Sequence, residues 1–139
     1  GVHSTYRSAL ERLVAHNDLT GRVTFHSYVG PATMVDLYRN AVSLVYPSRT
    51  EGFGIPPLES IACGTPAIVS DIPVTREVCG GGAFYVDPDS AASWQKAFAV
   101  LDNKDVLAAT LAAGRRRVEA YSWEYTRASR VAGIRQLVQ

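Results

Sequence analysis

Two glutamates and two glycines stand close together near the middle of this chain, and their types are suited to binding hydroxyl groups and anions. Glu51 directly precedes Gly52-Phe53-Gly54, and Glu59 follows eight positions after Glu51. Carboxylates accept hydrogen bonds from hydroxyl groups, and glycine lets the backbone take a positive φ or approach a ligand closely. Taken alone, Glu51 is better explained as a solvated loop charge, and Glu59 as a surface residue that stabilises a helix dipole.

The residues around these glutamates predict a strand, a loop and a helix. Val42 to Tyr46 is a short apolar run rich in β-branched residues, which is typical of a buried parallel strand. Pro56 and Pro57 fit the first turn of a helix, which we expect to run to about Cys63 and to be closed by Gly64. The side chains expected to face inward are Leu58, Ile61 and Ala62.

A helix that starts beside a glycine loop presents free N–H groups and the positive end of its dipole, which favours an anion such as a diphosphate. Ordinary turn chemistry explains the same glycines and prolines without any ligand. The pattern itself leaves both interpretations open.

Strands and helices are expected to alternate along the chain. Tyr6, Leu10, Leu13 and Val14 predict an opening helix. The predicted strands are Val23 to Ser27, Val42 to Tyr46, Ala67 to Ser70 and Ala83 to Val86. The other predicted helices are Thr33 to Asn40, Pro56 to Cys63, Val74 to Val78, Ala91 to Leu101, Asp105 to Tyr121 and Trp123 to Leu137. This order predicts one α/β domain over residues 1–139, with a Rossmann-like parallel sheet and helices on both faces.

The segment PSRTEGFGIPPLESIACGTP resembles the signature of the retaining glycosyltransferases of family 4 (group 1), which have the GT-B fold. The resemblance extends to VTF at Val23, DLYRNA at Asp36, PVTREV at Pro73, AFYVDP at Ala83 and YSW at Tyr121, in the family's order. It implies the C-terminal, donor-binding half of an enzyme that transfers a hexose from a nucleoside-diphosphate sugar to an acceptor hydroxyl, without a metal or other cofactor.

The resemblance also implies roles for particular residues. Glu51 would contact hydroxyls of the transferred sugar and is the candidate catalytic residue. Glu59 would hold the ribose hydroxyls, while His26 to Val29, with Tyr28 and Val29 as donor-binding candidates, would lie near the nucleobase. The loop candidates that would meet the sugar and phosphates, mainly through backbone amides, are Gly52, Phe53, Gly54 and Ile55.

The chain departs from the family pattern in two ways. Ser27 stands where the family usually has glycine, and no segment matches the earlier loop whose arginine and lysine grip the diphosphate. A complete doubly wound sheet would need two more βα units in front, so we expect an incomplete sheet that another segment or a second chain completes. Two alternatives stay open: a nucleotide-binding regulatory module without transfer activity, and a sugar-nucleotide epimerase or phosphorylase of the same fold. A phosphorylase would need a cofactor lysine, and Lys96 and Lys104 fall on late helical segments.

Other motifs favour structural roles. Cys63 and Cys79 form no C-x-x-C motif, and Cys63 is expected to be buried and inert. Gly80 to Gly82 is expected to be a flexible turn, and Arg115 to Arg117 a solvated basic face. Asp87-Pro88-Asp89 resembles a metal-binding D-x-D, but its position before a helical stripe favours an N-cap at an Asp or at Ser90. No metal is predicted.

The composition of the chain limits the kinds of partner that we expect it to bind. A net charge of +1 argues against nucleic acid, and 47% hydrophobic residues suffice for a core. No apolar run approaches the ~20 residues of a membrane span. We therefore expect a cytoplasmic protein. The N-terminal half of the enzyme, which this sequence lacks, could attach it to the inner face of the membrane. That half would also bind the acceptor, which could be a glycan, a lipid or a small molecule. The sequence does not specify the nucleobase, the hexose or the acceptor.

Overall fold

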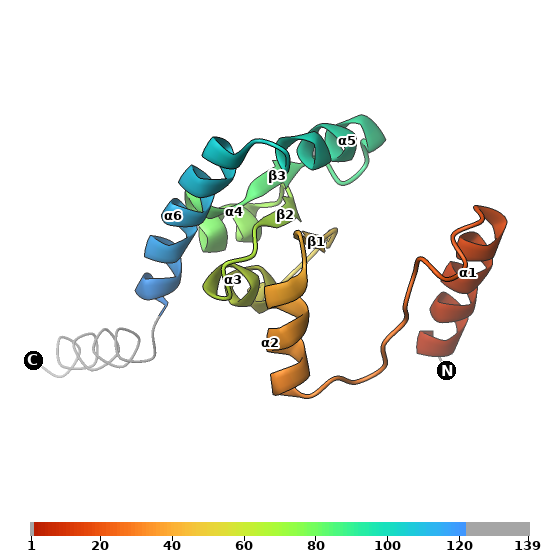
Figure 1. Ribbon diagram of the computed structural model, residues 1–139. Coiled ribbons are helices and arrows are strands. Elements are labelled where there is room, and N and C mark those ends of the chain that lie inside the picture. The colour runs from red at the N-terminus through yellow and green to blue at the C-terminus, as the bar shows by residue number, and fades with distance from the viewer. Residues whose placement is uncertain (1, 122–139) are drawn as a thin grey trace, which may run out of the picture. The chain divides into compact units, whose positions relative to one another are not determined.

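The computed structural model describes residues 2–121, which fall into two compact units, residues 2–30 and residues 31–121 (Figure 1). The first unit consists of helix α1 (Val2–His16) and the segment that follows it. The second unit holds the sheet and the remaining described helices. The residues predicted to form the helix Trp123 to Leu137 lie outside the described part of the chain.

Helix α1 confirms the opening helix, but the predicted strand at Val23 to Ser27 is wrong. After α1 the chain turns at Asp18 and Gly21, whose φ angles are 55° and 82°, and then runs on without regular structure. A strand requires a hydrogen-bonded neighbour. None of the described residues pairs with Val23 to Ser27, so the β-branched pattern alone does not produce a strand.

The second unit is built on a parallel sheet that, among the described residues, has the order β1-β2-β3. Its strands are β1 (Leu44–Tyr46), β2 (Ala67–Ser70) and β3 (Phe84–Val86). Val45 lies opposite Ile68 in the register of β1 and β2, and Val69 lies opposite Tyr85 in that of β2 and β3. The three predicted strands in this region are confirmed to within two residues.

The described α-helices of the second unit begin and end within two residues of their predicted positions. They are α2 (Pro31–Asn40), α3 (Ile55–Ala62), α4 (Pro73–Cys79), α5 (Ala91–Val100) and α6 (Lys104–Ala120). Between α4 and β3 lies a 3₁₀ turn, η1 (Gly80–Gly82), which was not predicted as a helix. Gly64 closes α3 with a φ of 88°, as predicted.

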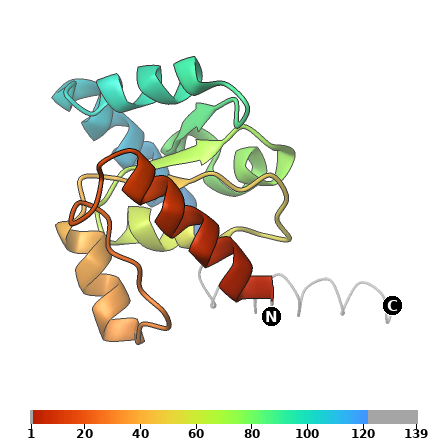
Figure 2. The ribbon, with the colours of Figure 1, turned by 90° about the vertical axis from the view of Figure 1, so that its right-hand side faces the viewer.

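The core lies on both faces of the sheet, because β2 is buried along its whole length. Ile68 faces α5 and packs with Val86 and Ala97. Val69 faces the other way and packs with residues of α3 and α4, including Ile61 and Val78. Figures 1 and 2 show α5 and α3 on opposite sides of the sheet. The predicted Rossmann-like sheet with helices on both faces is therefore confirmed.

Four expectations about side chains and turns need correction. Ala62 is exposed and Cys63 is only partly buried, although Ser60 and Ile61 of the same turn are fully buried. Cys79 is the buried thiol. Gly80 to Gly82 forms an ordered 3₁₀ turn packed on α6, where a Cβ on Gly82 would clash with the Cα atom of Gly114. Arg115 and Arg116 are exposed as expected, but Arg117 is partly buried and donates hydrogen bonds to the backbone carbonyls of Val78 (3.0 Å) and Glu77.

Candidate functional site

The loop between β1 and α3 starts at the carboxyl end of β1, the edge at which parallel α/β sheets bind ligands. Glu51 lies on this loop, is partly exposed and is not helical, as predicted. Its Oε1 accepts a hydrogen bond from the hydroxyl group of Tyr46, the last residue of β1. This bond, with a second from the Ser48 side chain, lowers the pKa of Glu51 below its ordinary value of 4.5. The Glu51 carboxylate is thus ionised at neutral pH and ready to accept hydrogen bonds.

The first turn of α3 is left open on its amino side. Gly54 is the N-cap residue, with φ 79° and ψ 61°, and no side chain caps the helix. This left-handed conformation explains glycine at this position, because other residues adopt it at a cost. Pro56 and Pro57 carry no N–H, so the open amide of the first turn belongs to Ile55. The helix start therefore offers positive partial charge beside an ionised glutamate.

Glu59 projects from α3 one turn beyond the prolines and is exposed. Its Oε2 accepts a hydrogen bond of 3.1 Å from the hydroxyl group of Tyr38, which comes from α2. Burial, followed by the hydrogen bond to Glu59, raises the pKa of Tyr38 to about 12. The phenol therefore stays protonated and donates a hydrogen bond to the carboxylate.

The tip of the loop is held on α6. The Phe53 ring, with 42% of its surface exposed, meets the ring of Tyr121 edge-on, with the centroids 5.3 Å apart. Tyr121 follows α6 and accepts a hydrogen bond of 2.9 Å from Arg117. The structure thus brings Glu51, Gly52, Phe53, Gly54 and Ile55 together on one anchored loop that continues into the helix bearing Glu59.

Tyr28 and Val29 belong to the first unit, and the side chain of Tyr28 is 89% exposed. Their predicted place near a nucleobase stays a prediction. Sequence reasoning missed Tyr46, Tyr38 and Tyr121. A signal for two of them existed: Tyr46 is an aromatic residue at the end of a strand that leads into the glutamate loop, and Tyr38 belongs to the apolar stripe of α2.

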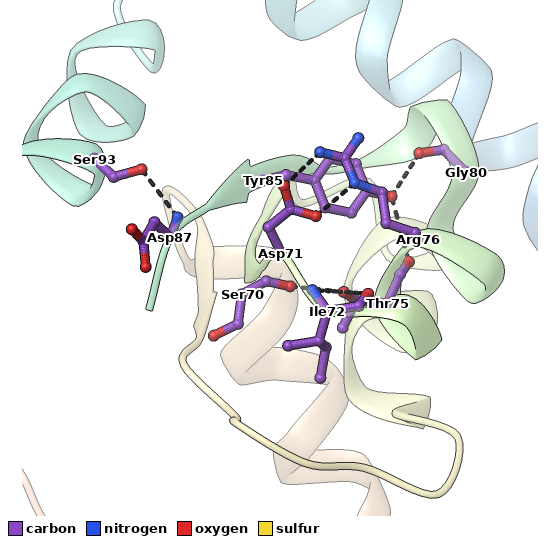
Figure 3. Close-up of polar contacts among 9 residues, drawn as sticks. All are labelled: Ser70, Asp71, Ile72, Thr75, Arg76, Gly80, Tyr85, Asp87 and Ser93. Carbon is purple, nitrogen blue, oxygen red and sulfur yellow. Dashed lines mark hydrogen bonds and ion pairs between the residues drawn. The ribbon is translucent and has the colours of Figure 1, made fainter. Parts of the chain in front are cut away.

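A second polar cluster lies where β2 and β3 end (Figure 3). The guanidinium of Arg76 donates two hydrogen bonds of 2.6 Å to the Asp71 carboxylate and stacks 3.9 Å from the centroid of the Tyr85 ring. The Tyr85 hydroxyl group donates to the carbonyl of Gly80 (2.5 Å). These contacts satisfy one another, so the cluster joins α4 to β3 and is not an open ligand site.

The segment after β3 confirms the N-cap reading of the D-x-D triplet. The side chain of Ser90 accepts a hydrogen bond of 3.2 Å from the backbone N–H of Ser93. The Oγ atom of Ser93 in turn accepts a hydrogen bond of 3.0 Å from the backbone N–H of Asp87 (Figure 3). The Asp89 carboxylate pairs with Arg49 from the loop after β1. Within residues 2–121, no group of three His, Cys, Asp or Glu side chains is placed to hold a metal ion.

A separate open hollow of about 380 Å³ lies along α2. Its lining residues are Thr33, Asp36, Leu37, Asn40 and Ala41. No predicted site residue lines it, and its walls offer a single carboxylate. The glutamate loop therefore remains the better candidate for a ligand site.

Comparison with known proteins identifies the family of this chain. The family model described as "Glycosyl transferases group 1" matches residues 2–117. The chain belongs to this family. This group 1 glycosyltransferase chain is 50% identical over 92 residues to the O-antigen chain mannosyltransferase RfbU of Salmonella typhimurium. The matched residues make up 66% of this chain and 26% of that protein. It is 32% identical to the D-inositol 3-phosphate glycosyltransferase of Rhodococcus jostii, over 85% of this chain and 27% of that protein.

The fold of this group 1 glycosyltransferase chain is also found in a solved structure. The sucrose-phosphate synthase of Thermosynechococcus elongatus superposes with a TM-score of 0.82 at 29% identity, over 96% of this chain and 35% of that one. The chain thus spans about a quarter to a third of the length of these relatives. None of the helices in the described part of the chain is both long and apolar enough to cross a membrane.

Proposed function

We propose that this chain is the donor-binding part of a retaining glycosyltransferase that moves a hexose from a nucleoside-diphosphate sugar to an acceptor hydroxyl. The observation that carries the proposal is the loop from Glu51 to Ile55, which joins an ionised carboxylate to an uncapped helix start at the carboxyl end of β1. Sugar hydroxyls need acceptors and a diphosphate needs N–H donors, and this loop supplies both.

We assign the transferred sugar to Glu51, the ribose to Glu59, and the diphosphate to the amides of Phe53, Gly54 and Ile55. Negative charge develops on the leaving diphosphate during transfer, and oriented amide dipoles at a helix start stabilise it without reorganising. The 50% identity to the O-antigen chain mannosyltransferase RfbU supports mannose as the hexose. No cofactor or metal enters this scheme.

The test is calorimetric titration of the protein with UDP- and GDP-linked mannose and glucose. Glu59→Gln and Glu51→Gln should each weaken donor binding about tenfold, because each removes a charged hydrogen-bond acceptor without changing side-chain size. Glu119→Gln is the matched control, since Glu119 is exposed near the end of α6. Equal affinities for wild type and both site variants would remove the two glutamates from the donor site.

A further inference from the structure

The two glutamates of the site share a feature that neither residue has by itself: each carboxylate accepts a hydrogen bond from a tyrosine of a neighbouring element. Tyr46 on β1 donates to Glu51, and Tyr38 on α2 donates to Glu59. These four residues come from β1, the loop after it, α2 and α3. Two independent phenol–carboxylate pairs therefore lie beside one candidate site.

Tyr46 is held firmly enough to orient its partner. Its ring packs against the core cluster that contains Leu58 and Val69. A Cβ built on Gly54 would lie 3.8 Å from Tyr46 Cε1, so the ring also supports the N-cap of α3. The Tyr46 side chain thus contacts both Glu51, before Phe53, and the start of α3 at Gly54, after it.

Tyr38 is fixed at both ends. Only 8% of its surface is exposed, and its backbone carbonyl accepts a hydrogen bond of 2.5 Å from the buried hydroxyl group of Thr65. Its phenol then reaches Glu59 Oε2, and among the described residues Glu59 Oε1 makes no hydrogen bond. One oxygen of the carboxylate is thereby anchored while the other stays available to a ligand.

We propose that Tyr46 and Tyr38 are positioning residues of the donor site, which hold Glu51 and Glu59 in the orientation that receives the sugar and the ribose. This inference rests on the proposed function. An unheld glutamate loses rotamer freedom when it binds a ligand, and a residue that restricts it beforehand reduces that cost. The phenol also stabilises the carboxylate form, which is the form that accepts hydroxyl hydrogen bonds.

The test uses the full-length protein with Tyr46→Phe and Tyr38→Phe, which keep the packed ring and remove only the hydroxyl group. Tyr85→Phe is the matched control, because the Tyr85 hydroxyl group donates to backbone carbonyls and not to either glutamate. Binding of the free nucleoside diphosphate and of the diphosphate sugar is measured by calorimetry. Thermal unfolding is measured in parallel.

The two variants should differ in a way that loss of packing cannot mimic. Tyr46→Phe should weaken binding of the diphosphate sugar about three- to tenfold and leave binding of the free nucleoside diphosphate unchanged, because Glu51 serves the sugar. Tyr38→Phe should weaken both ligands by the same factor, because both carry the ribose. Tyr85→Phe should weaken neither.

A second measurement needs no ligand. Carboxyl NMR should show the pKa of Glu51 rising toward 4.5 in Tyr46→Phe and staying low in Tyr85→Phe. The positioning role would be overturned if Tyr46→Phe and Tyr38→Phe bound both ligands as tightly as the wild type, or if the pKa of Glu51 did not change in Tyr46→Phe. Neither result would contradict the proposed donor site. Failure of the wild type to bind any diphosphate sugar would overturn the proposed function, and the positioning role with it, even if the pKa of Glu51 moves.

Discussion

Ser70 ends the central strand with a hydroxyl group that is fully buried and, among the residues the structure describes, has no hydrogen-bond partner. Its neighbour Thr75 is buried to the same degree, but its hydroxyl group donates to the Ser70 carbonyl at 2.6 Å and accepts from the Ile72 N–H at 3.3 Å (Figure 3). A buried polar group without a partner destabilises a fold, whereas a satisfied one contributes to it.

We therefore expect Ser70→Ala to raise the free energy of unfolding by about 1 kcal/mol, and Thr75→Val to lower it by about 1–3 kcal/mol. Urea titration of the two variants and the wild type measures both values. A loss in Ser70→Ala as large as that in Thr75→Val would show that the Ser70 hydroxyl group has a partner in solution.

Asp71 is the residue for which the structure most directly predicts a pH-dependent contribution to the free energy of unfolding. The hydrogen bonds from Arg76 lower the pKa of Asp71 below its ordinary value of 3.8. A carboxyl group whose pKa is lower in the folded state stabilises the fold at pH values above its unfolded pKa, and this contribution disappears as the pH falls through the folded pKa. The effect is small, because both side chains are about half exposed.

Asp71→Asn should therefore be slightly less stable than the wild type at pH 7, with the difference shrinking steadily as the pH falls below 3.8. Thermal unfolding across this pH range measures the difference. Asp102→Asn is the control, because Asp102 is exposed and has no ion pair within residues 2–121. A difference that stays constant with pH would rule out the ion pair as its source.

Two glycines control how α6 approaches the rest of the second unit. Gly82 of η1 and Gly114 of α6 lie so close that a Cβ on either would press on the backbone of the other. A Cβ on Gly114 would also lie 2.7 Å from Cγ2 of Ile61 on α3. This crossing allows the middle of α6 to pack directly on α3 and η1, which places Tyr121 against Phe53 of the site loop.

Gly82→Ala should lower the free energy of unfolding by about 1–3 kcal/mol, because the new methyl group meets backbone that cannot move aside easily. Gly114→Ala gains about 1 kcal/mol in helix propensity, so its net loss should be smaller. Gly81→Ala is the matched control, since a Cβ there makes only an ordinary contact of 3.6 Å with Ala113. Equal stability of Gly82→Ala and Gly81→Ala in urea would contradict this packing.

At the scale of the whole molecule, the two units differ in how their apolar side chains are covered. In the first unit, Tyr6, Leu10 and Leu13 are 71%, 51% and 58% exposed, respectively. In the second unit, every residue of β2 is buried. None of residues 6–30 is buried, and a helix of about 15 residues that gains little packing from its own unit is only marginally stable in water.

Backbone amides of α1 should therefore exchange hydrogen for deuterium much faster than those of β2 in the 139-residue chain. Hydrogen exchange followed by mass spectrometry measures this directly, and peptides from α3 provide an internal reference. Equal protection of α1 and β2 would mean that the apolar face of α1 is covered in solution.

The sequence predictions that were confirmed concern features that depend on residues close together in the chain. The buried β-branched run of β2, the left-handed Gly64 and the N-cap Ser90 depend on residues a few positions away, and all three were found where the sequence placed them. The order of glutamate, glycines and prolines likewise located the loop between β1 and α3 and indicated the family. Such features are encoded by local propensity and spacing.

Contacts between residues that are far apart in the sequence were decided by the tertiary structure alone. Val23 to Ser27 has strand propensity but no paired neighbour among the described residues. Arg117 caps carbonyls about 40 positions earlier, and Tyr38 meets Glu59 across 21 positions. These contacts depend on which helices pack together, and no single stretch of sequence carries that information. The sequence determined that a glutamate loop opens onto a helix start, and the packing of α2, β1 and α6 around it decided which side chains hold that loop in place.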